Sequence, residues 1–175
     1  METERTTRYR PFILTLIIVA LDQWSKYWVV ANIEIGTVFR SYLSDFLWIV
    51  HVRNSAIGFS IGAGLPLAVK KVLFVALPLI LLIILTLFVL KSREISPLQR
   101  WIVCGILGGG LGNIIDRAFR EEWVVDFISV KVWGLFGFER WPTFNIADAS
   151  IVVCAILLLI TMLFMSNKNR EVKDE

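Results

Sequence analysis

The stretch Val72–Leu90, with the sequence VLFVALPLILLIILTLFVL, contains 19 consecutive residues without a charged side chain. A helix of ~20 apolar residues spans the ~30 Å hydrocarbon core of a bilayer. The rest of the chain has a similar character, because 57% of its 175 residues are hydrophobic, 19% are charged and the mean hydropathy is +0.70. A soluble domain has ~45–50% apolar and ~25% charged residues. The sequence therefore excludes a soluble globular protein and predicts one integral membrane domain over residues 1–175.

Three further apolar segments accompany this stretch, and each carries polar residues near one end. Together the four segments predict membrane-spanning helices at about residues 10–30, 68–90, 99–119 and 145–165. The three flanking segments reach the ~20 residues that a span requires only when their polar ends are included. The polar tail Ser166–Glu175 is expected to fray. The predicted fold class is an all-α membrane protein with four transmembrane helices and a small extracytoplasmic β-rich loop region.

Lysine and arginine residues are concentrated on one predicted side of the membrane. Residues 1–10, 91–100 and 166–175 contain nine of them in 30 positions, whereas residues 31–71 and 117–144 contain eight in 69. Basic residues favour the cytoplasmic side of short loops. Both termini are therefore expected in the cytoplasm, with the outer loops, residues 31–67 and 120–144, on the opposite face.

The two outer loops contain patterns typical of β-structure. Phe46–Arg53 and Trp123–Val130 are rich in valine, isoleucine and aromatic residues, which predicts two strands. Asn54–Gly64 is rich in turn residues, and the aromatic segment Trp133–Trp141 is expected on the membrane surface. So few strands do not make an independent domain. We expect a small sheet resting on the helices.

Several polar side chains fall at a similar depth in the predicted helices. A rise of ~1.5 Å per residue places four of them ~18–30 Å from the cytoplasmic ends of their helices, namely Asp22, Asn113, Asp116 and Asp148. Asp126 lies in the loop directly above them. A carboxylate at mid-membrane costs ~2.5 kcal/mol or more on insertion scales. Such groups usually face a bundle interior or a wet cavity, so their convergence predicts a functional site.

Each of these residues also has a structural interpretation. Asp22 and Lys26 are four residues apart and can form an ion pair on one helix face. Asn113, Asp116 and Arg117 can fix a helix end, and Asp126 can be a surface residue of its strand. Asn145 and Asp148 have the spacing of a capping box. The glycines of the third helix favour close helix packing; they are Gly105, Gly108, Gly109, Gly110 and Gly112.

Other kinds of catalytic chemistry find little support. His51 is the only histidine and lies in a predicted strand without a nearby serine signature. Cys104 and Cys154 are far apart, so the sequence has no zinc-ligand spacing and no disulfide framework. Ser25 and Lys26 are adjacent and point in different directions on a helix. Carboxylate chemistry remains, with no metal and no cofactor expected.

Five motifs in this order then become recognisable: LDQWSK (21–26), RNSAIGFS (53–60), GGGLGNIIDR (108–117), VVDFI (124–128) and FNIADAS (144–150). In this arrangement across four predicted spans, the chain resembles the lipoprotein signal peptidase family, also called signal peptidase II. One departure is visible, because the family often has NTGAAF where this chain has Asn54-Ser55-Ala56-Ile57-Gly58-Phe59. That difference concerns the shape of the loop.

The resemblance implies an aspartic protease of the bacterial inner membrane. Its substrate would be a prolipoprotein that already carries diacylglycerol, cut just before the lipidated cysteine. The catalytic pair would be Asp126 and Asp148. The resemblance and the motifs around the pair imply a set of substrate-binding or site-supporting residues: Asp22, Lys26, Asn54, Gly108, Asn113, Asp116, Arg117, Asn145 and Ala147. It implies a monomer that acts on lipid-embedded substrate and does not bind nucleic acid.

A non-enzymatic membrane protein is the alternative, for example a small transporter that uses the same charges for ion passage or helix pairing. Asp126 distinguishes the two hypotheses. A transporter would have little use for an aspartate in a loop outside the spans, whereas a protease that cuts at the membrane surface requires one there.

Overall fold

The computed structural model describes residues 8–54, 64–92, 94–120 and 124–174, with side chains described up to Phe164. Its four long apolar helices confirm the predicted fold class. They are α2 (Phe12–Asn32), the continuous helix formed by α3 (Leu67–Lys71), η1 (Val72–Ala76) and α4 (Leu77–Lys91), then α5 (Pro97–Phe119) and α6 (Ile146–Asp174). The segment η1 is a short π-helix.

Two helix ends differ from the sequence prediction for identifiable reasons. α5 begins at Pro97 because Ser96 and Gln99 form a capping box at its start. α6 continues to Asp174, where the sequence predicted a frayed tail. Methionine, lysine, arginine and glutamate are good helix formers and allow the helix to extend beyond its apolar part.

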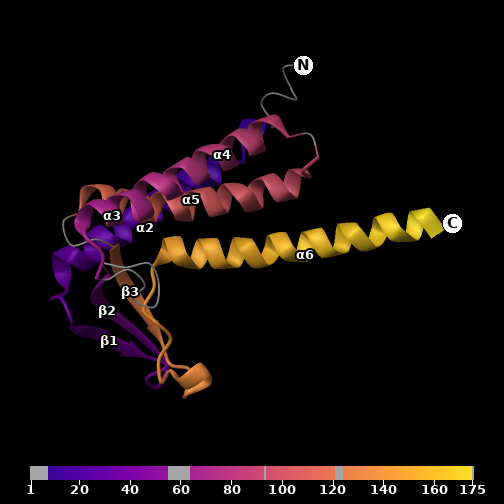
Figure 1. The fold of residues 1–175 in the computed structure, drawn as a ribbon. Coiled ribbons are helices and arrows are strands. Elements are labelled where there is room, and N and C mark those ends of the chain that lie inside the picture. Colours follow the sequence, from indigo (N-terminus) through magenta and orange to yellow (C-terminus); the bar gives the residue numbers. More distant parts are fainter. Residues whose placement is uncertain (1–7, 55–63, 93, 121–123, 175) are drawn as a thin grey trace.

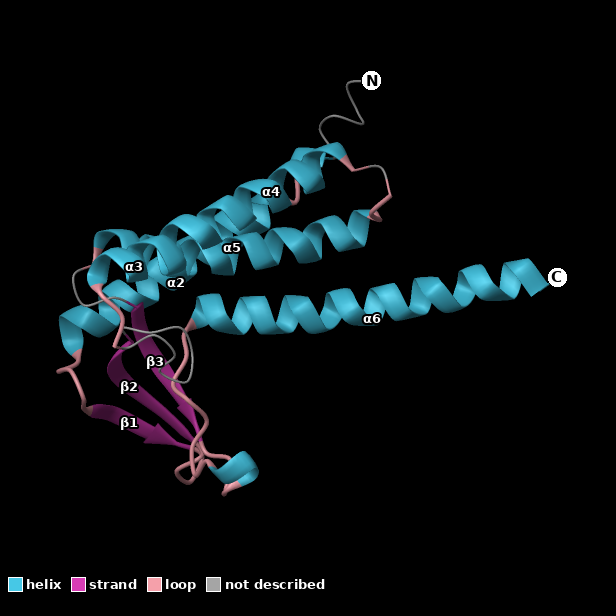
Figure 2. Ribbon diagram, in the orientation of Figure 1, coloured by secondary structure: helices cyan, strands magenta, loops and turns pink. Residues whose placement is uncertain are grey.

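The sheet contains three antiparallel strands in the order β1 (Val38–Tyr42), β2 (Leu47–Asn54) and β3 (Val124–Val130). β2 and β3 lie close to the predicted strands, and Trp123 lies outside the described residues. β1 was not predicted. All five of its residues are exposed, so the strand has no apolar alternation that the sequence could display. The sheet lies at one end of the helices, whereas the start of α2 and the end of α6 lie at the other (Figures 1 and 2).

A small apolar core joins the sheet to the end of α2. Val29 of α2 and Ile33, the residue just after this helix, pack against Val125 and Phe127 from β3. This core fixes β3, and with it Asp126, relative to the first spanning helix.

The far end of the sheet is held together by Arg140. Its guanidinium lies 3.7 Å from the ring centre of Trp48 and donates to the backbone carbonyls of Asp45, Phe46 and Ser129. The neighbouring segment exposes the large apolar side chains of Trp133, Leu135 and Phe136. The membrane-surface placement of this segment stays a prediction.

α5 is the central helix of the bundle. In the most apolar 18-residue stretch of α5, 61% of the residues are buried inside the protein. In the corresponding stretches of the other three spans this share is 22% or less. Glycines allow the close approach of its neighbours, as the sequence predicted. A Cβ at Gly108 would lie 2.9 Å from Ile18 of α2, and one at Gly109 would overlap the carbonyl oxygen of Ala147 in α6.

Two adjacent glycines provide a test of this packing. Gly109→Ala places a methyl group against the backbone of α6, whereas Gly110→Ala meets only the flexible end of Leu82. We expect Gly109→Ala to reduce the free energy of unfolding by about 1–3 kcal/mol, and Gly110→Ala to reduce it by much less. Thermal unfolding of both purified variants in detergent measures the difference. Equal melting temperatures would contradict the close α5–α6 contact.

Candidate active site

Asp126 lies on β3 and is buried, with 2% of the residue exposed. Its carboxylate accepts hydrogen bonds from two asparagine amides. Asn54 at the end of β2 donates to Oδ2 over 3.0 Å, and Asn145 donates to Oδ1 over 2.7 Å. The sheet and the start of α6 therefore meet at this carboxylate.

Asp148 lies in the first turn of α6 and forms a capping box with Asn145. Its backbone N–H donates to Asn145 Oδ1 over 2.9 Å, and the backbone N–H of Asn145 donates to Asp148 Oδ2 over 3.2 Å. The other carboxylate oxygen, Oδ1, accepts a 2.7 Å hydrogen bond from Asn113 of α5. Asp148 is partly exposed. The capping arrangement is thus present, and it leaves one carboxylate oxygen free to interact with groups beyond α6.

Two asparagines connect the two aspartates in one network. The side-chain amide of Asn145 donates to Asp126 and also lies 3.1 Å from Asn113 Oδ1. Asn113 in turn donates to Asp148. Residues from β3, α5 and α6 that are far apart in sequence therefore share one hydrogen-bonded site.

A buried lysine lies beneath this network. Lys26 Nζ is 2.8 Å from Asp22 Oδ2 and 3.1 Å from Asp116 Oδ2, and none of the three side chains is exposed. It also donates to Asn113 Oδ1 over 3.0 Å. The predicted pair of Asp22 and Lys26 is present, and it is extended by Asp116 from α5. A buried ammonium requires such partners because burial without them is costly.

The same two carboxylates also hold the backbone on either side of the site. Asp22 Oδ1 accepts the backbone N–H of Ala147 over 3.0 Å, and Asp116 Oδ2 accepts that of Val125 over 3.2 Å. Ala147 immediately precedes Asp148, and Val125 immediately precedes Asp126. The ion cluster is therefore connected directly to the backbone that carries both predicted catalytic residues.

Two further residues of the cluster were not predicted. Gln23 donates to Asp116 Oδ1 over 2.9 Å and to the Gly112 carbonyl over 3.0 Å, and Arg120 Nε lies 3.1 Å from Asp116 Oδ1. Asp116 and Arg120 are four residues apart, so this ion pair could have been predicted from the helix spacing. The contacts of Gln23 join α2 to α5 and had no local signal.

The remaining predicted site residues occupy different positions. Arg117 lies where its charge interacts with those of Asp148, Asp126 and Asp116, and its buried Nε has no hydrogen-bond partner within the described part of the chain. Gly108 faces Thr15 and Ile18 of α2, which makes it a packing residue one or more turns from the network. The RNSAIGFS motif is described only at Arg53 and Asn54, and its residues 55–60 lie outside the described residues.

The environment of Asp126 favours its protonated form. Burial away from water raises the pKa of Asp126 to about 7, and the negative charge of Asp148 acts in the same direction. The hydrogen bonds from Asn54 and Asn145 oppose this rise because they stabilise the carboxylate. At neutral pH a large fraction of the molecules therefore keeps a proton on Asp126, whereas an exposed aspartate would have lost it.

Metal-dependent and histidine-based catalysis find little support among the described residues. No group of three or more His, Cys, Asp or Glu side chains in the described ranges is arranged to hold a metal ion. His51 is buried, with its Nδ1 2.7 Å from the carbonyl oxygen of Ile33. That contact ties β2 to the end of α2 and gives the histidine a structural role.

The arrangement of helices and sheet has counterparts among solved structures. One bacterial membrane enzyme superposes with a TM-score of 0.78 and 30% sequence identity, covering 91% of this chain and 90% of its own. A second gives a TM-score of 0.73 and 31% identity, covering 88% and 92% of the two chains. The fold and the carboxylate site therefore define a membrane enzyme.

The chain belongs to the signal peptidase (SPase) II family, whose model matches residues 14–164. It is 47% identical over 166 residues to a lipoprotein signal peptidase of Treponema denticola, covering 95% of each chain. It is 45% identical over 171 residues to one of Borrelia hermsii, covering 98% of this chain and 99% of the relative. The resemblance drawn from the five motifs is thereby confirmed, and the chain is a protease of this family.

The raised pKa of Asp126 predicts a pH-dependent stability. The folded protein keeps a proton that the unfolded chain, with an ordinary aspartate pKa of ~3.9, releases. This contribution is complete below about pH 4 and is lost as the pH rises through about 7. Between about pH 5 and about pH 8, we expect the melting temperature of the wild type in detergent to fall by roughly 5 °C more than that of Asp126→Asn.

Glu139→Gln is the matched control, because it removes an outer-loop carboxylate whose side chain is 68% exposed. This variant should keep the wild-type pH dependence. Parallel curves for wild type and Asp126→Asn would show that Asp126 does not hold the proton.

Proposed function

We propose that this enzyme is an aspartic endopeptidase of the bacterial inner membrane that cuts diacylglyceryl-modified prolipoproteins just before the lipidated cysteine. Asp126 and Asp148 are its catalytic pair. The observation that carries the proposal is the single hydrogen-bonded network, through Asn145 and Asn113, that contains both carboxylates. The family supplies the lipoprotein substrate class.

The two carboxylates differ in environment, and this difference assigns their chemical roles. Asp126, buried and with a pKa of about 7, carries the proton. Asp148 is partly exposed at the start of α6, where the helix dipole favours a negative charge. Asp148 is therefore the general base and Asp126 the general acid.

The reaction follows from these roles. Asp148 takes a proton from a water molecule whose oxygen attacks the carbon of the scissile carbonyl. Asp126 donates its proton to the carbonyl oxygen, which stabilises the negative charge that develops there. The tetrahedral intermediate then collapses. The nitrogen of the lipidated cysteine leaves with the proton from Asp148, and Asp126 regains a proton from the hydroxyl group. The products are a signal peptide with a free carboxylate and a lipoprotein with a free amino terminus.

The other predicted site residues have positioning roles in this proposal. Asp22, Lys26 and Asp116 fix the backbone beside the catalytic pair through the contacts with Ala147 and Val125. Two further residues complete the site: Asn54 orients Asp126, and Arg117 places a positive charge near the pair. No metal or cofactor takes part, and the enzyme acts as a monomer.

The location of the site fits a substrate held in the outer leaflet. The distribution of basic residues favours cytoplasmic termini, and the sheet lies at the opposite end of the helices from the start of α2 and the end of α6 (Figure 1). Asp126 lies on a strand outside the spanning helices, which supports hydrolysis at the membrane surface over transport through the bundle. The lipid anchor of the substrate would hold the scissile bond at this level.

Cleavage of a synthetic lipobox peptide by the purified enzyme in detergent tests the proposal. We expect cleavage immediately before the cysteine when the peptide carries diacylglycerol, and at least ~100-fold slower cleavage of the same peptide without lipid. A chelator should leave the rate unchanged. Cleavage at another bond, equal rates on both peptides, or activity lost in chelator and restored by zinc would contradict it.

A further inference from the structure

Arg120 connects the buried ion cluster to the surface of the protein. It directly follows α5, and its backbone N–H closes the last turn of that helix by donating to the carbonyl of Asp116 over 2.8 Å. Its side chain is 25% exposed, whereas those of Lys26, Asp22 and Asp116 are fully buried. The Nε–H of Arg120 donates to Asp116 Oδ1 over 3.1 Å. A guanidinium at the rim of the cluster is therefore bound to a carboxylate inside it.

The carboxylate of Asp116 is held through both of its oxygens. Oδ1 accepts a hydrogen bond from Arg120 and another, over 2.9 Å, from Gln23. Oδ2 faces the ammonium of Lys26 at 3.1 Å and accepts the backbone N–H of Val125 over 3.2 Å. An ionised carboxylate has acceptor sites for about four donors, so these contacts define one orientation of the group. Rotation of the carboxylate would break the contact with Val125.

Arg120 also adds a second positive charge to the cluster. Lys26 faces the carboxylates of Asp22 and Asp116, so one positive charge lies between two negative ones. The charge of Arg117 acts on Asp116 as well, but it is shared with the proposed catalytic pair. A buried carboxylate without a counter-ion is costly. Arg120 provides that counter-ion for Asp116 and leaves Lys26 able to hold both of its partners.

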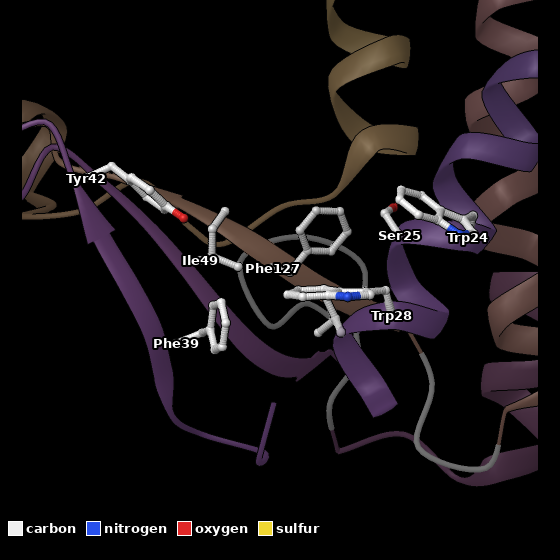
Figure 3. Close-up of a pocket in the computed structure, with 8 residues that line it drawn as sticks. Trp24, Ser25, Trp28, Phe39, Tyr42, Ile49 and Phe127 are labelled. Carbon is white, nitrogen blue, oxygen red and sulfur yellow. The ribbon is translucent and has the colours of Figure 1, made fainter. Parts of the chain in front are cut away.

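The backbone of β3 is fixed on both sides of Asp126. The preceding residue, Val125, donates its N–H to Asp116. The side chain of the following residue, Phe127, points to the other face of the strand and lies beside Trp28 of α2 in an apolar pocket (Figure 3). Loss of the contact at Val125 removes one of these two anchors and leaves the other. We therefore expect such a loss to shift the strand locally without unfolding the sheet.

The ion pair of Arg120 with Asp116 differs from an ordinary pair on a helix surface. Exposed pairs four residues apart contribute little, because water and salt screen their charges. Here the acceptor is fully buried, and it also holds the backbone of a second element, β3. A change at Arg120 therefore reaches beyond α5.

We propose that Arg120 is a positioning residue of the protease, which holds Asp116 in the orientation that fixes the backbone of β3 beside Asp126. The inference rests on the proposed function, in which Asp126 is the general acid. Arg120 acts on it through Asp116 and Val125. A displacement of about 1 Å at a reacting group lowers the rate roughly 100-fold. Loss of Arg120 should therefore lower kcat while KM changes little, because the groups that bind substrate stay in place.

Kinetics with a diacylated lipobox peptide test this role. Arg120→Gln removes the charge, and Arg120→Lys keeps it. Arg40→Gln is the matched control, because it removes a positive charge from an exposed position of β1. We expect Arg120→Gln to lower kcat about tenfold or more with KM within about twofold of wild type. Arg120→Lys should keep at least about a third of the wild-type kcat, and Arg40→Gln should match the wild type.

Two kinetic results would overturn the proposal. One is an unchanged kcat in folded Arg120→Gln, with folding checked by its melting temperature. The other is a raised KM with an unchanged kcat, which would indicate that Arg120 contacts the substrate instead of positioning Asp116.

Backbone amide exchange separates failure of this role from failure of the proposed function, because it requires no substrate. Wild type and Arg120→Gln are compared by NMR in detergent with isotope-labelled valine and phenylalanine. We expect the N–H of Val125 to exchange about tenfold faster in the variant. The N–H of Phe127, which donates to the carbonyl of Phe144 over 3.1 Å, should keep its rate.

The exchange result decides the proposal whether or not the peptide is cleaved. Faster exchange at Val125 alone, in an enzyme that does not cleave the lipobox peptide, would refute the proposed function and support the positioning contact. Equal exchange at Val125 in both proteins would overturn the contact. So would equal acceleration at Val125 and Phe127, which indicates general destabilisation of the sheet.

Discussion

The buried ammonium of Lys26 is the interaction on which the rest of the site depends. A charge without solvent contact requires compensation, and Asp22 and Asp116 provide it from two different helices. Each of these carboxylates also accepts a backbone N–H from the residue just before a proposed catalytic aspartate: Asp22 through its other oxygen, and Asp116 through the oxygen that faces Lys26. One ion cluster therefore fixes the positions of α2, α5, α6 and β3 relative to one another.

This arrangement explains why a small membrane protein carries a sheet at all. The proposed mechanism uses two carboxylates within reach of each other, one of them outside the spanning helices. β3 supplies the first and the start of α6 supplies the second, while asparagines bridge between them. Burial raises the pKa of Asp126, whose carboxylate lies against Asn54 and Asn145, while its neighbours Val125 and Phe127 pack against the end of α2. The strand β3 thus anchors the sheet and holds the buried carboxylate at once.

The features of the fold and of the site that have a local signal could be predicted from the sequence. Apolar runs marked the four helices, and spacing alone predicted the Asp22–Lys26 pair and the capping box of Asn145 with Asp148. β1 escaped prediction because none of its residues is buried. The contacts of Gln23 with α5 join segments about 90 residues apart, and no local pattern encodes such a distance.

The central claim is that Asp126 and Asp148 act as one catalytic unit, and a double-variant comparison tests it most directly. The kcat/KM for a diacylated lipobox peptide is measured for Asp126→Asn, Asp148→Asn and the combined variant, with the melting temperature of each. We predict that each single change reduces kcat/KM by at least ~1,000-fold and that the combined variant is little worse, because residues acting as a unit are not additive. A folded Asp148→Asn variant with near-normal turnover would contradict it and leave Asp148 as a helix cap alone.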